Sequence, residues 1–409
     1  RTSSTVLVKS CDHLLIEVTM RPVHWFLLLL IVGFSTGYFT TGIEIDSAKN
    51  KVDHSHDETP PICRHPHSFK LNDGKCLPMV GLGVAESDSR TYQAVKWAIN
   101  ESSYRLIDTA SHESYGNEDQ VGQAVRDVIY TNNKTANNIN RQDIFVTTKL
   151  WDDSHGFEET IEAFEESLEN LGLEYIDLYL IHSPFGGYLV ETYDALLFLQ
   201  EQPEQLVKSI GVSNFGIKHL EAIRQNGTRP VPAVNQFEIH PLLFQQRKPL
   251  LEYCQQHNIQ VQAFGSMLYG TLSSWEQKEP LKTIMTKHPT KTSAQILLRW
   301  AIQHNIAGIP KSTNQQRILD NIQVFDFVLD EDDMNSLDDW GNTVSPSDRL
   351  MYKEDWNWNP IDEAEVHEGE TNLFPDFEGY QNYFDGQEEE EDDDDDDDYD
   401  DGDEEDDED

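Results

Sequence analysis

The sequence predicts an α/β protein whose main domain is a (β/α)8 TIM barrel, with a short N-terminal hairpin before it and a disordered acidic tail after it. Two observations lead to this fold class. Eight short apolar runs alternate with segments whose apolar residues recur at helical spacing, which fits a closed barrel better than an open doubly wound sheet. In addition, no glycine-rich dinucleotide turn follows an early strand, because Gly81-Leu82-Gly83 lacks the third glycine and the helix start.

The expected strands are the apolar runs themselves, and residues 161–171 give one clear helical pattern between two of them. Ahead of the first run, residues 68–71 and 75–77 flank a turn at Asn72-Asp73-Gly74. This pattern is typical of a hairpin, which is expected to cap the bottom of the barrel. In chain order the eight expected strands are residues 79–83, 105–108, 144–148, 176–181, 207–211, 233–236, 260–263 and 306–309.

The charge of the chain is strongly negative and unevenly spread. The 409 residues include 30 Lys and Arg against 75 Asp and Glu, a net charge of −45 that argues against a nucleic-acid binder. Of the 22 residues from 388 to 409, 20 are acidic, and the rest of the chain carries 55 acids and 30 bases. The tail is expected to be a disordered, solubilising segment. A weak, diffuse calcium sink is the second interpretation, because Ca²⁺ prefers carboxylate oxygens and no spaced EF-hand loop is present.

The composition divides the chain into six segments. Residues 20–37 combine a basic start, an apolar run at 25–34 and small residues at 35–37, which is the pattern of a signal peptide. An uncleaved signal anchor is the alternative. The expected division is an upstream or untranslated segment (1–19), the signal peptide or anchor (20–37), a linker (38–65), the barrel (66–345), a variable C-terminal segment (346–387) and the acidic tail (388–409).

Further features favour the secretory pathway, either the endoplasmic reticulum lumen or secretion. Sequons for N-glycosylation begin at Asn100, Asn133 and Asn226. Cys63 and Cys76 bracket a short polar stretch and could pair in an oxidising compartment. The sequence therefore predicts a luminal or secreted glycoprotein.

Polar or titratable side chains stand at the expected C-terminal ends of six strands. In a (β/α)8 barrel the functional site lies at this end. A single buried polar group has a structural explanation, but six together indicate function, because burying charge is costly unless it is used or paired. The residues are Asp108, Lys149, His182, Ser213 with Asn214, Gln236, and Lys311.

These residues belong to seven motifs that occur in order along the chain. They are Leu106-Ile107-Asp108-Thr109-Ala110, Tyr115-Gly116-Asn117-Glu118, Thr148-Lys149-Leu150-Trp151, Leu180-Ile181-His182-Ser183-Pro184, Gly211-Val212-Ser213-Asn214-Phe215, Asn235-Gln236-Phe237-Glu238-Ile239-His240-Pro241 and Ile309-Pro310-Lys311-Ser312. Through them the chain resembles the aldo-keto reductases over roughly residues 68–337. The resemblance implies an NADPH-dependent carbonyl reductase with a catalytic tetrad of Asp108, Tyr115, Lys149 and His182.

Reduction of a carbonyl requires a hydride on carbon and a proton on oxygen, which explains the residue types of the tetrad. A phenol such as Tyr115 is a poor proton donor near neutrality unless a neighbouring ammonium lowers its pKa. Lys149 is expected to do so, with Asp108 keeping the lysine charged and placed. His182 is expected to orient the substrate oxygen.

The same resemblance implies the cofactor contacts. Ser213, Asn214 and Gln236 are similar to the residues that hold the nicotinamide carboxamide, and Phe264 takes the place of a Tyr that stacks on the ring. A cluster with two cations resembles the pocket for the adenosine 2′-phosphate, which favours NADPH over NADH. It comprises Lys311, Ser312, Asn314, Arg317 and Asn321.

Two departures from the family pattern bear on the site. The stretch from Asp108 to Tyr115 is two residues longer than usual, so Glu113 takes the place of the tyrosine if the register follows the strand. Register taken from the helix side keeps Tyr115, and this alignment is preferred because loops tolerate insertions. In the substrate pocket, Ala85 and Ser183 stand where many relatives carry Trp, while Trp151 remains. A wider and less apolar pocket is expected.

Three functions are therefore weighed. The first is a monomeric NADPH-dependent reductase of a small carbonyl substrate. The second is a non-catalytic, cofactor-binding barrel that acts as a sensor or scaffold. The third is an acidic luminal calcium-binding protein, with calcium held weakly by the tail and no metal site in the barrel. The aromatic residues between 345 and 387 are expected to form a substrate lid or a docking segment.

Overall fold

The computed structural model describes residues 4–9, 15–20, 63–111, 115–132, 139–224, 229–345 and 361. The chain divides into two compact units, Arg1–Thr59 and Pro60–Asp409. In the first, β1 (Ser4–Lys9) pairs antiparallel with β2 (Leu15–Met20). The predicted signal peptide after Met20, the sequons at Asn133 and Asn226, and the acidic tail lie outside the described residues and stay predictions.

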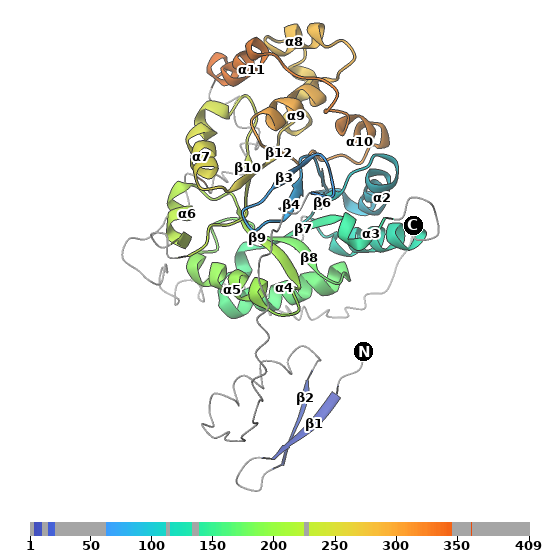
Figure 1. Cartoon of the computed structure of the whole chain (residues 1–409), viewed down its shortest axis with the longest axis vertical. Helices are drawn as coiled ribbons and strands as arrows, with labels where there is room; N and C mark the ends of the chain where they lie inside the picture. The colour runs from blue at the N-terminus through green and yellow to red at the C-terminus, as the bar shows by residue number, and fades with distance from the viewer. Residues whose placement is uncertain are drawn as a thin grey trace, which may run out of the picture. The chain divides into compact units, whose positions relative to one another are not determined.

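The second unit contains one sheet of eight strands in the order β12-β11-β10-β9-β8-β7-β6-β5, with parallel neighbours. Isolated parallel bridges join Val80 to Gly308 and Gly83 to Lys311, and these close the sheet on itself. The predicted (β/α)8 barrel is therefore confirmed (Figure 1). The strands are β5 (Leu82–Gly83), β6 (Leu106–Asp108), β7 (Phe145–Leu150), β8 (Ile176–Ile181), β9 (Val207–Ser213), β10 (Val234–Glu238), β11 (Gln260–Phe264) and β12 (Ala307–Gly308).

The observed strand bounds differ from the expected ones mainly at the seam of the barrel. The run 176–181 is a strand over its full expected length, whereas 79–83 and 306–309 contribute only the two-residue strands β5 and β12. At this seam the backbone still pairs, because the Gly81 N–H donates to the Gly308 carbonyl at 2.9 Å and the Gly308 N–H donates to the Met79 carbonyl at 2.9 Å. The seam is thus held by short, local pairings.

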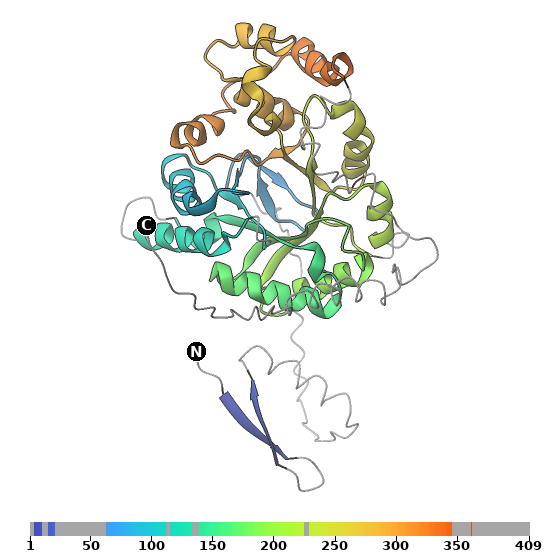
Figure 2. The same ribbon diagram turned by 180° about the vertical axis from the view of Figure 1, so that it is seen from behind.

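The helices surround the barrel, as the views from front and back show (Figures 1 and 2). They are α2 (Thr91–Glu101), α3 (Glu118–Asn132), α4 (Phe157–Leu171), α5 (Leu189–Glu201), α6 (Ile217–Arg224), α7 (Phe244–Gln256), α8 (Leu281–Lys287), α9 (Ser293–Gln303), α10 (Gln315–Asn321) and α11 (Glu331–Asp338). Short 3-10 helices are η1 (Asp88–Arg90), η2 (Arg141–Asp143), η3 (Asp152–Ser154), η5 (Leu268–Gly270), η6 (Leu272–Ser274) and η7 (Trp340–Thr343). Within the described part of the chain, none of them is long and apolar enough to cross a membrane.

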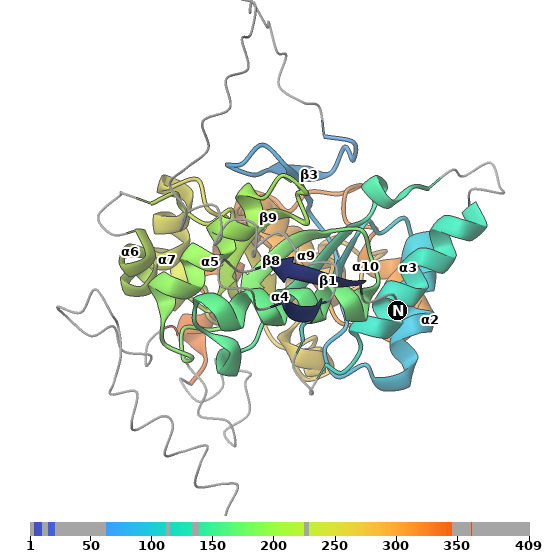
Figure 3. The same cartoon turned by 90° about the horizontal axis from the view of Figure 1, so that it is seen from below.

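The predicted hairpin closes one end of the barrel. Its strands are β3 (Ser68–Lys70) and β4 (Cys76–Pro78), and Figure 3 shows β3 at that end. Leu71 and Leu77 belong to the same buried cluster as side chains from inside the barrel, so the hairpin acts as an apolar plug. The other members of this cluster are Leu106, Phe145, Leu178, Leu180, Ala233, Val234, Ala307 and Ile309.

A disulfide between Cys63 and Cys76 fastens the chain that leads into the hairpin, with Cα atoms 5.7 Å apart. Arg64 donates to Gln142 at 2.9 Å and pairs with Asp143 at 3.3 Å. The ring of His67 stacks on Phe325 with centroids 3.8 Å apart. Cys63, Arg64 and His67 therefore tie the start of this unit to the barrel and its hairpin.

Removal of this disulfide, by the double substitution Cys63→Ser/Cys76→Ser, is expected to lower the free energy of unfolding by about 2–4 kcal/mol. The cross-link closes a loop with a sequence separation of 13, and its loss frees that loop in the unfolded chain. Urea unfolding with and without dithiothreitol measures the effect. The reductant should lower the stability of the wild type to that of the variant and leave the variant unchanged. A reductant effect of equal size in both proteins would contradict the prediction.

Candidate active site

The alternation of side chains along each strand brings the predicted catalytic groups inside the barrel. Leu106 belongs to the interior cluster, so Asp108, two residues further on, faces the same interior. By the same rule Lys149 and Gln236 face the interior. Lys149 lies four residues after Phe145 and Gln236 lies two residues after Val234, and both Phe145 and Val234 belong to the interior cluster. The polar groups therefore form a layer directly above the apolar plug, at the C-terminal ends of the strands.

Asp108 and Lys149 form a buried ion pair in this layer. The Lys149 Nζ lies 2.5 Å from Asp108 Oδ1 and donates to the Thr109 carbonyl at 2.7 Å. The two side chains are only 1% and 3% exposed, for Lys149 and Asp108 respectively. The second carboxylate oxygen, Oδ2, accepts from Gln236 Nε2 at 2.7 Å. Both ends of the carboxylate are therefore held, which fixes the position of the lysine ammonium.

Three aromatic side chains stand around this pair. The ring of Tyr115 lies with its centroid 5.1 Å from Lys149 Nζ, and its edge meets the ring of His182 at a centroid distance of 5.9 Å. Trp151 also meets His182 edge-on, at 4.6 Å. The structure thus brings Asp108, Tyr115, Lys149 and His182 together at one end of the barrel, as the sequence predicted.

The loop that carries Tyr115 is anchored on both sides of the extra residues. Before them, Ser111 donates to the Lys149 carbonyl through its N–H at 3.2 Å and its hydroxyl at 2.9 Å. After them, the buried Asn117 accepts from the Thr109 hydroxyl at 2.6 Å and donates to the Val84 carbonyl at 2.8 Å. Glu113, the alternative in the other register, lies outside the described residues. Asn117 belongs to the motif Tyr115-Gly116-Asn117-Glu118, and its anchoring role is not visible from the sequence.

The electrostatics of Tyr115 differ from the sequence expectation. Desolvation raises the pKa of the phenol above its ordinary value, and the negative charges of Asp108 and Glu86 raise it further. The sequence predicted that a neighbouring ammonium lowers this pKa, and the structure contradicts this, because desolvation and the two negative charges all raise it. The phenol is protonated at neutral pH and is able to donate a hydrogen bond.

The predicted nicotinamide contacts lie on neighbouring strand ends. The Ser213 hydroxyl donates to the Gln236 carbonyl at 2.8 Å, and Asn214 Nδ2 donates to the His182 carbonyl at 2.9 Å. Gln236 Nε2 also donates to Gln262 Oε1 at 2.7 Å. Phe264 ends β11 with its ring partly exposed. Gln262 was missed, although a polar residue inside an apolar strand run was a visible signal.

The predicted phosphate cluster lies at the start of α10. Lys311 and Arg317 are exposed, and Lys311 Nζ donates to the Glu86 carbonyl at 3.3 Å. Asn314 caps the helix by accepting from the Arg317 N–H at 3.0 Å, and the Ser312 hydroxyl accepts from the Asn314 N–H at 3.2 Å. Asn321 is buried at the end of the helix. Two cationic side chains are thus presented to solvent, while the polar residues between them shape the backbone.

The predicted substrate-pocket residues fall into two groups. Ala85 and Trp151 are partly exposed. Ser183 is fully buried, and its hydroxyl lies 2.7 and 2.8 Å from the two carboxylate oxygens of Asp152. Ser183 therefore contacts Asp152, a residue that the sequence motifs did not single out.

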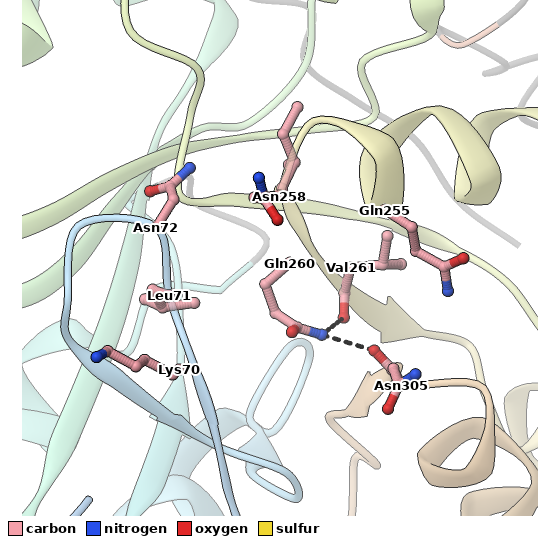
Figure 4. Close-up of a pocket in the computed structure, with 9 residues that line it drawn as sticks. Lys70, Leu71, Asn72, Gln255, Asn258, Gln260, Val261 and Asn305 are labelled. Carbon is pink, nitrogen blue, oxygen red and sulfur yellow. Dashed lines mark hydrogen bonds between the residues drawn. The ribbon is translucent and has the colours of Figure 1, made fainter. Parts of the chain in front are cut away.

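Figure 4 shows a separate cavity of about 480 Å³. It is lined by the hairpin turn and by the start of β11, so it belongs to the N-terminal end of the barrel, where no predicted site residue lies. Its lining includes Lys70, Leu71, Asn72, Gln255, Asn258, Ile259, Gln260, Val261 and Asn305. No group of three or more metal-binding side chains is found in the part of the chain that the structure describes.

The chain is similar in sequence to known reductases. Residues 80–342 match the model of the aldo/keto reductase family. The chain is 45% identical over 272 residues to a 9,11-endoperoxide prostaglandin H2 reductase of Trypanosoma cruzi, covering 66% of this chain and 89% of that protein. It is 39% identical over 273 residues to a glyoxal reductase of Bacillus subtilis, covering 66% and 91%.

Solved structures give the same result. An aldo-keto reductase from a deep-sea metagenome library matches with a TM-score of 0.59 and 44% identity, over 66% of this chain and 94% of that one. A Bombyx mori aldo-keto reductase in complex with NADP matches with a TM-score of 0.59 and 36% identity, over 69% and 95%.

The buried ion pair predicts a specific pattern of stability. Lys149→Met is expected to lower the free energy of unfolding by about 3–5 kcal/mol, because it leaves the Asp108 carboxylate buried without a counter-charge. The double substitution Asp108→Asn/Lys149→Met should recover most of this loss. Urea unfolding of the single and double variants measures the coupling.

Arg90→Met is the matched control, since it removes a cation from the exposed pair with Asp88 and should leave the unfolding curve in place. Additive effects of the two site substitutions would contradict the prediction.

Proposed function

The chain belongs to the aldo/keto reductase family, and from this premise we propose that it reduces an aldehyde or ketone to the alcohol with NADPH, using Tyr115 as the general acid. The observation that carries the proposal is the position of Tyr115. Its ring lies beside both Lys149 and His182, although two extra residues precede it in the chain. The family resemblance alone left the register of this tyrosine open.

The proton is the part of the reaction that the protein itself supplies. The Tyr115 phenol is protonated because its pKa is raised, so it is able to donate to the carbonyl oxygen of a substrate. Charge then develops on the phenol oxygen, and the nearby Lys149 ammonium stabilises that charge. Asp108 and the Thr109 carbonyl hold the ammonium in place at 2.5 and 2.7 Å. His182 orients the carbonyl oxygen toward the phenol.

NADPH supplies the hydride when it is bound. The residues present fit this cofactor at both of its ends. The partly exposed ring of Phe264 provides a stacking surface, and Gln236, whose amide nitrogen is held by Asp108 and Gln262, would hold the carboxamide. At the other end, the exposed cations Lys311 and Arg317 suit a 2′-phosphate, which favours NADPH over NADH. The NADP complex of the Bombyx mori relative supports the assignment.

We also propose that the protein works in the secretory pathway. The Cys63–Cys76 disulfide supports this address, since such bonds persist in oxidising compartments. The sequon asparagine Asn100 is exposed at the end of α2, which supports a glycan there. Peptide mapping without reduction, on protein isolated from its source, tests the proposal. Free thiols at both Cys63 and Cys76 would contradict it.

The first functional prediction concerns the proton donor. Tyr115→Phe is expected to lower kcat about 10²–10⁴-fold, because the ring is kept and the proton is lost. NADPH oxidation, followed by absorbance with a panel of aldehydes, measures the loss. Tyr130→Phe is the control, since that ring is 66% exposed on α3 and should change nothing. Glu113→Gln should also leave activity in place.

Two outcomes would contradict this assignment. Turnover that survives Tyr115→Phe and disappears in Glu113→Gln would place the acid in the other register. Tight NADPH binding without turnover of any carbonyl by the wild type would favour a cofactor-binding sensor over an enzyme.

The second prediction concerns substrate shape. Val84 and Ser183 are buried and Ala85 is small, so the large aromatic walls of many relatives are missing. Benzaldehyde-type substrates are therefore expected to lose the stacking contribution, which is worth about 1 kcal/mol per aromatic pair. Relative kcat/KM for benzaldehydes and for sugar aldehydes such as glyceraldehyde measures the preference. A strong preference for the aromatic aldehydes would contradict the wider, less apolar pocket.

A further inference from the structure

A hydrogen bond joins the residues that follow β7 to the residues that follow β8, where His182 lies. Trp151 and Asp152 follow β7, while His182 and Ser183 follow β8. The Ser183 hydroxyl lies 2.7 and 2.8 Å from the oxygens of Asp152, and it accepts from the Phe185 N–H at 3.1 Å. Since the backbone N–H occupies the acceptor side of the hydroxyl, its hydrogen is directed at the carboxylate.

Two links connect the Asp152 carboxylate to residues that neighbour His182 in space or in the chain. Asp152 directly follows Trp151, whose ring meets His182 at 4.6 Å. It is also bonded to the residue that directly follows His182. The Asp152 side chain is 19% exposed, so part of the carboxylate reaches solvent. Where many relatives have an apolar indole, this chain therefore has a Ser183 hydroxyl that is bonded to a carboxylate.

Among the contacts that the structure describes, the titratable side chain closest to the Asp152 carboxylate is that of His155. His155 Nε2 lies 3.9 Å from Asp152 Oδ1, and His155 Nδ1 is 2.7 Å from the Gly187 carbonyl. Burial lowers the pKa of this imidazole, so His155 is neutral near pH 7 and does not cancel the charge. Asp153 is the next carboxylate along the chain and is exposed.

We propose that Asp152, held by Ser183, is a specificity-determining residue of the carbonyl site. It favours aldehydes that carry hydroxyl groups or other hydrogen-bond donors, and it disfavours aldehydes that carry a negative charge. Donors near the carbonyl find an oriented acceptor in the carboxylate. Anions meet a like charge at close range in a site of reduced dielectric. The proposal rests on the proposed reductase activity and names the substrate class of that same site.

The test compares two substrates that differ in charge, succinic semialdehyde and its methyl ester, in wild type and Asp152→Asn. The Asn side chain keeps an oxygen for the Ser183 hydroxyl and removes the charge. Asp152→Asn is expected to raise kcat/KM for the semialdehyde about tenfold and to change that of the ester less than about twofold, as expected for removal of one nearby like charge. The change should appear mainly in KM, and added salt should reduce the discrimination in the wild type.

Asp153→Asn is the matched control, because it removes an adjacent but exposed carboxylate. It should leave the ratio of the two substrates unchanged. An equal shift in both variants would overturn the proposal, since it would reflect net charge alone. No change in the substrate ratio in Asp152→Asn, with the ester still reduced, would also overturn it. No turnover of any aldehyde by the wild type would instead refute the reductase function, and the specificity proposal with it.

Discussion

The buried pair of Asp108 and Lys149 is the constraint on which the site depends. An ionised group inside a barrel is stable only if a counter-charge and hydrogen bonds compensate its desolvation. Here both carboxylate oxygens and the ammonium are engaged, by Gln236 and by the Thr109 carbonyl. Since Asp108 and Lys149 lie on β6 and β7 and Gln236 lies on β10, the full set of bonds forms only when the sheet curls into the barrel. The Tyr115 ring packs near the same ammonium, so the position of the proposed proton donor depends on the ion pair.

The two ends of the barrel have different roles, with stabilising contacts at the N-terminal end and the catalytic groups at the C-terminal end. At the N-terminal end, Leu71 and Leu77 of the hairpin plug an apolar interior, and the Cys63–Cys76 disulfide fastens the incoming chain. At the C-terminal end, the interior turns polar within two residues of the apolar layer. An apolar floor excludes water from below the ion pair, and this strengthens the electrostatic interactions above it. The variable loops are then able to change specificity without disturbing the plug.

The link between Asp152 and Ser183 illustrates such a change. The backbone of β7 and β8 carries His182 and Trp151 in the places that the family resemblance implies. Ser183 stands where many relatives have Trp, and its hydroxyl engages a carboxylate. One small side chain thus replaces an apolar contact by a hydrogen bond to a carboxylate. The fold accommodates this because the buried Ser183 hydroxyl is satisfied, by Asp152 and by the Phe185 N–H.

Much of the fold and of the site was determined by the sequence alone. Strand number, the capping hairpin and the layer of polar strand ends follow from local periodicity, since side chains alternate with period two along a strand. Asp108, Lys149 and Gln236 were predicted for this reason. Only the tertiary structure decided which groups meet, because contacts such as Gln236 with Gln262, Ser183 with Asp152 and Asn117 with Val84 join distant positions. It also decided the pKa direction of Tyr115, since desolvation depends on what surrounds the phenol, and no local pattern in the sequence encodes those surroundings.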